Sequence, residues 1–333
     1  MSENIENKDF LTIKNLRVEY FSGKTVVHAV NGVNLKLGKG KTLGLVGETG
    51  AGKTTIAKSI LRILPDVGAR IVEGEIILDG DDLLKKKEGE MRKIRGNEIS
   101  MIFQDPMTAL NPVERVGDQV AEVVKLHSDL SKEKCAERAK EMLRMVGITD
   151  DRYSEYPHQF SGGMKQRIVI AMALACNPQV LLADEPTTAL DVTIQAQVLD
   201  LIADLRNRYN TSMLLITHDL GVVAQVCDEV AIIYAGRIVE YGTKEQVFHH
   251  PSHPYTLGLF GAIPDMAGDD EWLHPIEGLP PDPTVVMAGC PFAPRCKYAT
   301  DDCFKNDIPT TETPDGHECA CINMKTVHEK EGK

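Results

Sequence analysis

The stretch "GETGAGKTT" (47–55) has the residue types and spacing of a phosphate-binding loop. It places Gly47, Gly52, Lys53 and Thr54 as Gly, four residues, Gly-Lys-Thr, between an apolar run and a helical pattern. Such glycines let the backbone direct N–H groups at phosphate oxygens, beside the positive end of a helix. We expect Lys53 to reach the β- and γ-phosphates and the Thr54 hydroxyl to help hold Mg²⁺. The strand-to-helix setting favours this interpretation over a chance glycine-rich turn.

Two adjacent carboxylates in "VLLADEP" (180–186) supply what hydrolysis of a bound nucleotide needs. Four apolar residues, 180–183, predict a buried strand that ends at Asp184. Asp184 is expected to coordinate Mg²⁺ directly or through water, and Glu185 to orient and deprotonate the attacking water as general base. The alternative is that both carboxylates only cap the following turn.

Two further polar residues follow apolar strand patterns. His218 ends "LLITH" and Gln104 ends "SMIFQ", so we expect both side chains at the same edge of a parallel sheet. His218 is a candidate catalytic residue, and Gln104 a candidate contact to both Mg²⁺ and water. A structural role is the alternative for each.

A second element suited to phosphate is "SGGMKQR" (161–167). Ser161, Gly162 and Gly163 precede a long helix and again place N–H groups at its positive end. One γ-phosphate does not need two such cradles from one chain. We therefore expect the second cradle to bind a nucleotide held by another subunit, although Ser161 also fits an ordinary helix N-cap.

The elements that must position these residues follow from hydrophobic periodicity. Antiparallel strands are predicted at 11–20 and 26–37, and strand–helix alternation elsewhere predicts a parallel sheet covered by helices. The other predicted strands are 42–47, 74–80, 98–104, 179–186, 212–219 and a hairpin at 229–242. The predicted helices are 53–64 (ended by Pro65), 116–124, 132–148, 161–177, 192–209 and 243–250. Pro-rich connections from Pro251 onward predict a separate appendage.

Composition narrows the functional class. A net charge of −12 over 333 residues argues against a general nucleic-acid binder, which needs clustered Lys and Arg. The N-terminus lacks the basic and apolar regions of an export signal, and the longest apolar runs are much shorter than the roughly 20 residues that span a bilayer. We therefore expect a soluble, cytoplasmic chain that works at a membrane only through another subunit.

Five of the eight cysteines lie in the C-terminal stretch "GCPFAPRCKYATDDC … HECAC". Clustered cysteines in a reducing compartment favour metal ligands over disulfides. The Cys-x-x-Cys pairs usual for zinc are absent, and so are the common ferredoxin spacings. The spacing therefore leaves an iron-sulfur cluster, a zinc site and reduced structural cysteines open.

Taken together, these motifs resemble those of the ATP-binding cassette (ABC) family: Walker A "GETGAGKTT", the Q-loop Gln104, the signature "SGGMKQR", Walker B "VLLADE", the D-loop "TALD" ending at Asp191, and the switch His218. The resemblance implies an α/β P-loop NTPase fold with a RecA-like core, an antiparallel β subdomain and a helical subdomain at about 105–165. It implies that two cassettes enclose ATP, with Tyr20 stacking on adenine unless it is an ordinary strand residue. The implied nucleotide-binding residues are Tyr20, Gly47, Glu48, Thr49, Gly50, Ala51, Gly52, Lys53, Thr54, Thr55, Ser161, Gly162, Gly163 and Asp191.

The phrases "FQDPMTALNP", "HPYTLGLFGAIP" and "GCPFAPRC" are similar to those of the peptide and nickel importer subfamily. This implies a cassette at 8–250, an extension at 251–333, and an ATPase that energises uptake of dipeptides or oligopeptides, or alternatively of nickel or oligosaccharides. The implied partners are a second ATPase subunit, identical or paralogous, two membrane permease subunits and a solute-binding protein, which place the chain peripherally at the cytoplasmic face of the membrane. A soluble ABC ATPase of DNA repair or translation, and a redox or metal sensor, are the competing classes.

Some members of that subfamily hold a 4Fe-4S cluster in this appendage. The resemblance favours Cys290, Cys296, Cys303 and Cys321 as its ligands, with Cys319 as a substitute for Cys321, and zinc as the alternative metal. We expect Arg295 to offset the negative charge of the four thiolates. We also expect the appendage to lie outside the hydrolytic machinery.

Overall fold

The structure is a computed structural model that describes residues 9–188, 190–262 and 275–331. The chain forms two compact units, which are described one at a time. The first unit comprises the residues up to Leu11, then Leu37–Thr42 and Asp79–Thr217. The second comprises Thr12–Lys36, Leu43–Leu78 and the chain from His218 on.

Three parallel strands form the centre of the first unit. They lie in the order β6 (Ile99–Ile102), β7 (Val180–Asp184) and β8 (Ser212–Thr217), with Ile102 opposite Ala183 and Asp184 opposite Ile216. Every residue of the three strands is buried, as expected for a parallel sheet with both faces covered. Their common direction brings the residues that follow β6 and β7 to one edge.

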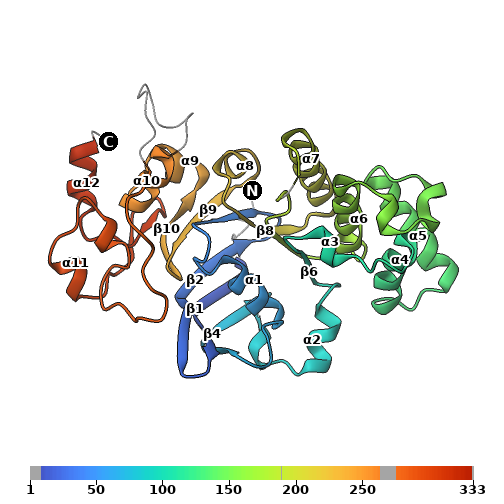
Figure 1. Ribbon diagram of the computed structural model, residues 1–333, viewed down its shortest axis with the longest axis horizontal. Helices are drawn as coiled ribbons and strands as arrows, with labels where there is room; N and C mark the ends of the chain where they lie inside the picture. The colour runs from blue at the N-terminus through green and yellow to red at the C-terminus, as the bar shows by residue number, and fades with distance from the viewer. Residues whose placement is uncertain (1–8, 189, 263–274, 332–333) are drawn as a thin grey trace, which may run out of the picture. The chain divides into compact units, whose positions relative to one another are not determined.

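Helices account for most of the rest of the first unit. They are α2 (Glu88–Ile94), α3 (Pro106–Ala109), α4 (Val116–Leu126), α5 (Lys132–Met145), α6 (Gly162–Leu174) and α7 (Val192–Tyr209), with 3₁₀ turns η1 (Leu83–Lys85), η2 (Asp150–Ser154) and η3 (Pro157–Gln159). The helices α4 and α5 pack against each other and both contact α6 (Figure 1). These elements form the helical insert that the sequence predicts between the Q-loop and the signature.

The second unit contains a sheet built on a long hairpin. The strands β1 (Asp9–Ser22, in this unit from Thr12 on) and β2 (Thr25–Gly38) are neighbours joined by two residues, and β4 (Ala69–Leu78) lies on the other side of β1. This confirms the antiparallel strands predicted at 11–20 and 26–37. A two-residue strand, β5 (Asp81–Asp82), follows β4 in sequence and belongs to the first unit.

A second group of strands in this unit runs in the order β11-β12-β10-β9-β3. The strands are β3 (Thr42–Val46), β9 (Glu229–Tyr234), β10 (Arg237–Thr243), β11 (Thr311–Glu312) and β12 (Glu318–Cys319). The pair β3–β9 is parallel, whereas β9–β10, β10–β12 and β11–β12 are antiparallel. The cysteine-rich region therefore extends this sheet through β11 and β12, because Cys319 pairs with Glu240.

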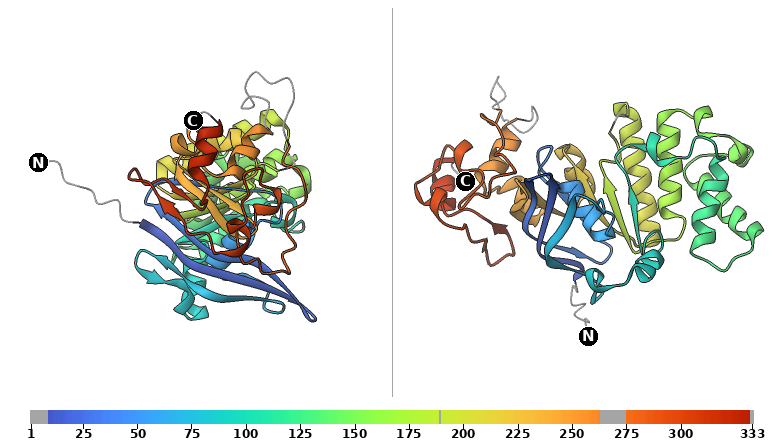
Figure 2. Two further views of the ribbon diagram at one scale, coloured as in Figure 1. Left: turned by 90° about the vertical axis from the view of Figure 1, so that its left-hand side faces the viewer. Right: turned by 60° about the horizontal axis from the view of Figure 1, so that its bottom comes forward.

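The helices of the second unit are α1 (Lys53–Leu61), α8 (Leu220–Val226), α9 (Lys244–His249), α10 (Pro254–Gly261), α11 (Asp302–Lys305) and α12 (Met324–Glu331), with a 3₁₀ turn η4 (Ala293–Arg295). Figure 2 shows the orange and red C-terminal elements of this unit. The predicted helix to Pro65 is too long: α1 ends at Leu61, because Arg62 adopts a left-handed conformation (φ 52°) and its N–H closes onto the carbonyl oxygens of Lys58 and Ser59.

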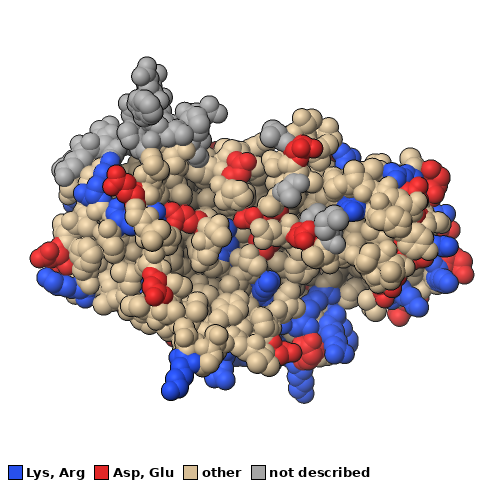
Figure 3. Space-filling view, in the orientation of Figure 1, with Lys and Arg blue, Asp and Glu red and all other residues tan. Residues whose placement is uncertain are grey.

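The surface carries both signs of charge, and acidic and basic side chains both occur along the margin of the face in Figure 3. Within the described ranges, no helix combines the length and the apolar character needed to cross a bilayer.

Candidate active site

The loop Gly47–Thr55, here called the phosphate loop, joins the buried strand β3 to helix α1 in the second unit. Gly52 has φ 102°, and a Cβ at this position would lie 2.4 Å from the carbonyl oxygen of Ala29, so only glycine fits. The Lys53 side chain is buried, and its Nζ donates to the carbonyl oxygens of Gly47 (2.7 Å) and Glu48 (3.1 Å). The loop thus folds around the ammonium group at the N-terminus of α1, which suits an anion.

Tyr20, the predicted adenine contact, lies near the C-terminal end of β1. Its hydroxyl is 3.2 Å from Oγ1 of Thr55, which places the ring beside the first turn of α1. The side chain is half-buried, and part of it stays accessible.

In the first unit, the end of β7 brings two of the predicted catalytic residues together. The Glu185 carboxylate accepts hydrogen bonds from Nε2 of Gln104 (2.9 Å) and from Oγ1 of Thr188 (2.9 Å). Glu185 has φ 45°, rare for a residue with a side chain, and its N–H donates to the carbonyl oxygen of Ile216 (2.8 Å). Asp184, one residue earlier, is 2 % exposed. The strand end therefore holds one buried carboxylate and one half-buried carboxylate with two donors directed at it.

The signature residues begin helix α6. The Ser161 hydroxyl accepts the N–H of Met164 (3.4 Å), so Ser161 is the N-cap, as the alternative interpretation held. Gly163 permits close packing, since a Cβ there would lie 2.7 Å from Cγ2 of Ile194 on α7. Gly162 is exposed, and its added Cβ would meet only an ordinary contact with Leu190. Close packing therefore explains Gly163. Gly162 packs closely against no described residue and leaves the N-terminus of α6 exposed.

His218 lies at the end of a strand, and Asp191 lies at the start of a helix. His218 directly follows β8 and is exposed. Asp191 is the exposed N-cap of α7, where its carbonyl oxygen accepts the N–H groups of Ile194 and Gln195. Ala189 of the D-loop lies outside the described residues.

The sequence patterns missed two residues of the first unit that contact Walker B. One is Thr188, which holds Glu185 and stands inside the D-loop phrase. The other is Gln166 on α6, whose Nε2 donates to the carbonyl oxygen of Pro186 (2.6 Å), while its buried Oε1 has no partner among the described residues. A buried glutamine on an otherwise apolar helix face is the signal that points to Gln166.

Four of the C-terminal cysteines line one small cavity in the second unit: Cys290, Cys296, Cys303 and Cys321. The N–H of Tyr298 donates to Sγ of Cys296 (3.4 Å), and Nδ2 of Asn323 to Sγ of Cys303 (3.4 Å). Burial raises the pKa of the Cys290 and Cys296 thiols, and that of Cys321 to about 11. Cys319 is buried in β12 and does not line this cavity.

As they stand, no three His, Cys, Asp or Glu side chains within 9–188, 190–262 and 275–331 are placed to hold a metal ion. Four of the cysteines share the lining of one cavity, and two of their sulfur atoms accept N–H donors. Hydrogen bonds of this kind tune iron-sulfur centres.

Arg295 does not serve the cysteines as the sequence suggests. Its guanidinium instead contacts the Glu48 carboxylate of the phosphate loop, at 3.0 and 3.3 Å from Nη1. The expectation that the appendage stands apart from the hydrolytic machinery is therefore wrong at this residue. Spacing alone gave no signal for this contact, because the two residues are far apart in sequence.

Comparison with known proteins identifies the family of the chain. The family model described as "ABC transporter" matches residues 30–188, and the model "Oligopeptide/dipeptide transporter, C-terminal region" matches residues 239–303. The chain is 48 % identical to the probable peptide ABC transporter ATP-binding protein y4tR of Sinorhizobium fredii over 98 % of both chains. It is 49 % identical to the dipeptide transport ATP-binding protein DppD of Bacillus subtilis over 93 % of both chains.

Solved structures show the same fold. A dimeric, post-hydrolysis structure of the ATP-binding cassette MJ0796, bound to ADP and Pi, has a TM-score of 0.63 and 28 % sequence identity. The match covers 70 % of this chain and 98 % of that one.

Proposed function

This chain belongs to the family of ATP-binding subunits of ABC importers for oligopeptides and dipeptides, and on that premise we propose how its residues bind and hydrolyse ATP to drive peptide uptake. The observation that carries the proposal is the hydrogen bond between Gln104 and Glu185 at the end of β7. It fixes a carboxylate next to the buried Asp184, at the strand end where phosphoryl chemistry needs a base.

We assign the residue roles separately for the phosphate loop and for the end of β7. N–H groups from Gly50 to Thr55 and the Lys53 ammonium bind the phosphates, and Tyr20 contacts the adenine. Thr54, Gln104 and Asp184 would hold Mg²⁺, which neutralises phosphate charge when bound. Glu185 accepts a proton from water at its carboxylate, and Gln104 and His218 orient the reacting groups.

The second cradle is proposed to complete another chain's site. Ser161, Gly162 and Gly163 at the open N-terminus of α6, with Asp191, would contact the nucleotide bound by a second ATPase subunit. The relative MJ0796 is dimeric with bound ADP and Pi, which supports this arrangement. Loss of the γ-phosphate contacts then separates the two cassettes and resets the permease.

The family implies a permease and a second ATPase as partners. We propose the cassette at 8–250, its helical subdomain at about 105–165, and the extension at 251–333. The chain would bind two membrane permease subunits from the cytoplasmic face, and a solute-binding protein would deliver the peptide to them. Nickel or oligosaccharide remains the alternative cargo.

The decisive experiment compares Glu185→Gln with the wild type in the assembled importer. We expect the variant to retain ATP binding and to lose at least about 100-fold in turnover, because the amide cannot accept the proton. The cargo is identified by measuring ATP hydrolysis by the wild-type importer with a peptide, with nickel and with an oligosaccharide. We expect the peptide to stimulate hydrolysis. Wild-type turnover in the variant would refute the role of Glu185.

A second proposal concerns the cysteine cavity. We propose that Cys290, Cys296, Cys303 and Cys321 hold a 4Fe-4S cluster, because these four line the cavity and Cys319 does not. The matched pair Cys321→Ser and Cys319→Ser tests this on anaerobically purified protein. Iron, acid-labile sulfide and the visible absorption band should fall in the first variant and persist in the second. Zinc in place of iron, or no metal in the wild type, would contradict the cluster.

A further inference from the structure

Glu48, the second residue of the phosphate loop, is held at each of its polar groups. Its carbonyl oxygen accepts from Lys53 Nζ (3.1 Å) and from the N–H of Ala51 (3.1 Å). Its own N–H donates to the hydroxyl of Tyr255 (3.0 Å), and its carboxylate pairs with Arg295. Two of these contacts come from the C-terminal extension, far outside the family's nucleotide motifs.

The guanidinium of Arg295 is almost fully enclosed, with 6 % of the side chain exposed. Besides Glu48, its Nη1 contacts the hydroxyl of Tyr234 (3.2 Å), while Nε and Nη2 donate to the carbonyl oxygens of Glu277 (3.0 Å) and Ile276 (3.2 Å). Contacts from all three nitrogen atoms fix the guanidinium in one position, unlike the ends of a surface ion pair.

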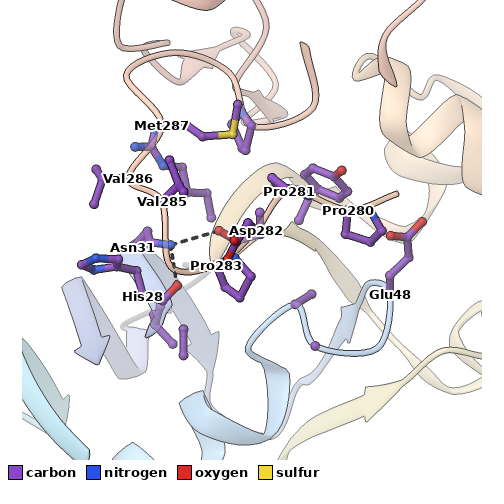
Figure 4. A pocket seen from close by; sticks show the side chains of 18 of the residues that line it. His28, Asn31, Glu48, Pro280, Pro281, Asp282, Pro283, Val285, Val286 and Met287 are labelled. Atoms are coloured by element: carbon purple, nitrogen blue, oxygen red, sulfur yellow. Dashed lines mark hydrogen bonds between the residues drawn. The ribbon is translucent and has the colours of Figure 1, made fainter. Parts of the chain in front are cut away.

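The surroundings reinforce this position. The rings of Tyr234, Tyr255 and Phe292 pack together with centroids 4.6 to 5.4 Å apart. Glu48 also lines a cavity of about 340 Å³, whose other lining residues include residues of the segment Pro280–Met287 (Figure 4). This segment is tied to β2, because the N–H of His28 donates to the carbonyl oxygen of Pro283 (2.8 Å).

The electrostatic consequence concerns the triphosphate. The Glu48 side chain is 28 % exposed, so its charge is only partly screened by water. An unpaired carboxylate one residue from Gly47 would oppose the positive potential that Lys53 and the N–H groups create for phosphate. Arg295 cancels this charge while leaving the backbone of the loop in place.

We propose that Arg295 is a positioning residue for ATP binding, which neutralises Glu48 and so keeps the phosphate loop receptive to anions. The inference rests on the proposed function, since it assigns a role only if this loop binds nucleotide. It predicts something that a purely structural role does not. The loss of MgATP affinity on removal of Arg295 should be caused by the unpaired Glu48 carboxylate, so that removal of Glu48 as well should restore the affinity.

A double-mutant cycle on the full-length protein tests whether the Glu48 charge opposes nucleotide binding. The affinities for MgATP and MgADP are measured by titration calorimetry. We expect Arg295→Gln to weaken MgATP binding about tenfold, within the usual range of coupling between sites. Glu48→Gln should bind MgATP more tightly than wild type, and the double variant should recover most of the loss of Arg295→Gln. The loss should also be larger for MgATP than for MgADP and should shrink at high salt.

The controls separate this inference from the proposed function. Arg237→Gln removes an arginine that lines the cavity next to Glu48 but pairs with the exposed Asp307, and it should leave the affinity for MgATP unchanged. Lys53→Ala should abolish binding; if it does not, the proposed function fails. If Lys53→Ala abolishes binding but Glu48→Gln weakens it, or the double variant is as weak as Arg295→Gln, only the role of Arg295 is overturned. If Arg295→Gln does not fold, the MgATP affinities of Arg295→Lys and Glu48→Gln still show whether the Glu48 charge opposes binding.

Discussion

At the scale of single residues, the site depends on how one carboxylate is held. Glu185 adopts a left-handed backbone conformation at the end of β7, which costs energy for a residue with a side chain. The cost is offset by the backbone hydrogen bond to Ile216 and by donors from Gln104 and Thr188. Such constraint is characteristic of functional positions.

Thr188 offers a test of this constraint. Thr188→Val removes one hydrogen bond to the Glu185 carboxylate, and bonds to charged groups contribute about 1.5–3 kcal/mol. We therefore expect turnover to fall about tenfold or more with little change in the affinity for MgATP. Thr188→Ser keeps the hydroxyl and should retain most of the activity. Equal losses in both variants would show that the hydroxyl does not position Glu185.

At the scale of elements, the extension is anchored where helix α10 begins. The buried Glu240 carboxylate on β10 accepts the N–H groups of Ser252 (2.6 Å) and His253 (3.0 Å) and contacts Nε2 of His317 (2.8 Å). Nδ1 of His253 in turn accepts the N–H of Tyr255 (3.1 Å), which caps the helix that presents Tyr255 to the phosphate loop.

This cap predicts a pH dependence of stability. Burial lowers the pKa of His253 from 6.5 to about 4, against the opposing effect of the Glu240 charge. The unfolded chain therefore binds a proton below about pH 6.5 that the folded chain does not take up until about pH 4. The contribution of His253 is fully present above this window, and the free energy of unfolding should fall as the pH drops from 7 to 5.

The matched variant is His253→Asn, whose side-chain oxygen can accept the Tyr255 N–H without titrating. Denaturant unfolding at several pH values should give a shallower dependence for this variant than for wild type. Identical slopes would mean that another group controls acid stability.

At the scale of the whole molecule, ATP hydrolysis must be linked to contact with other chains. The chain has a net charge of −12, and no described helix could cross a membrane. The open N-terminus of α6 and the exposed Asp191 are surfaces that a second cassette could use. The extension adds a link of its own, since Arg295 stands between Cys290 and Cys296 and reaches the phosphate loop.

The prediction at this scale is a stable ATP-bound dimer. In Glu185→Gln, nucleotide that is bound but not hydrolysed should hold two ATPase subunits together. Light scattering with and without MgATP would show a doubling of mass that Lys53→Ala abolishes. If the proper partner is a paralogue, the doubling requires mixing the two chains, and a monomer in every mixture would contradict the head-to-tail site.

Sequence patterns by themselves predicted the fold class, most of the strands and helices, and the motifs of the ATP-binding family. This was possible because periodicity and glycine spacing are local properties of the sequence. The buried strands β6, β7 and β8 also correspond to largely apolar runs. The predicted end of α1 was wrong, because the left-handed residue Arg62 ends the helix before Pro65.

Only the tertiary structure decided which distant side chains meet. It joined Gln104 to Glu185, gathered four cysteines around one cavity, and turned Arg295 away from them toward Glu48. The physical reason is that an ion pair depends on the approach of two groups in space. Glu48 and Arg295 are separated by 247 positions in the sequence, and no periodic pattern over that distance signals their approach.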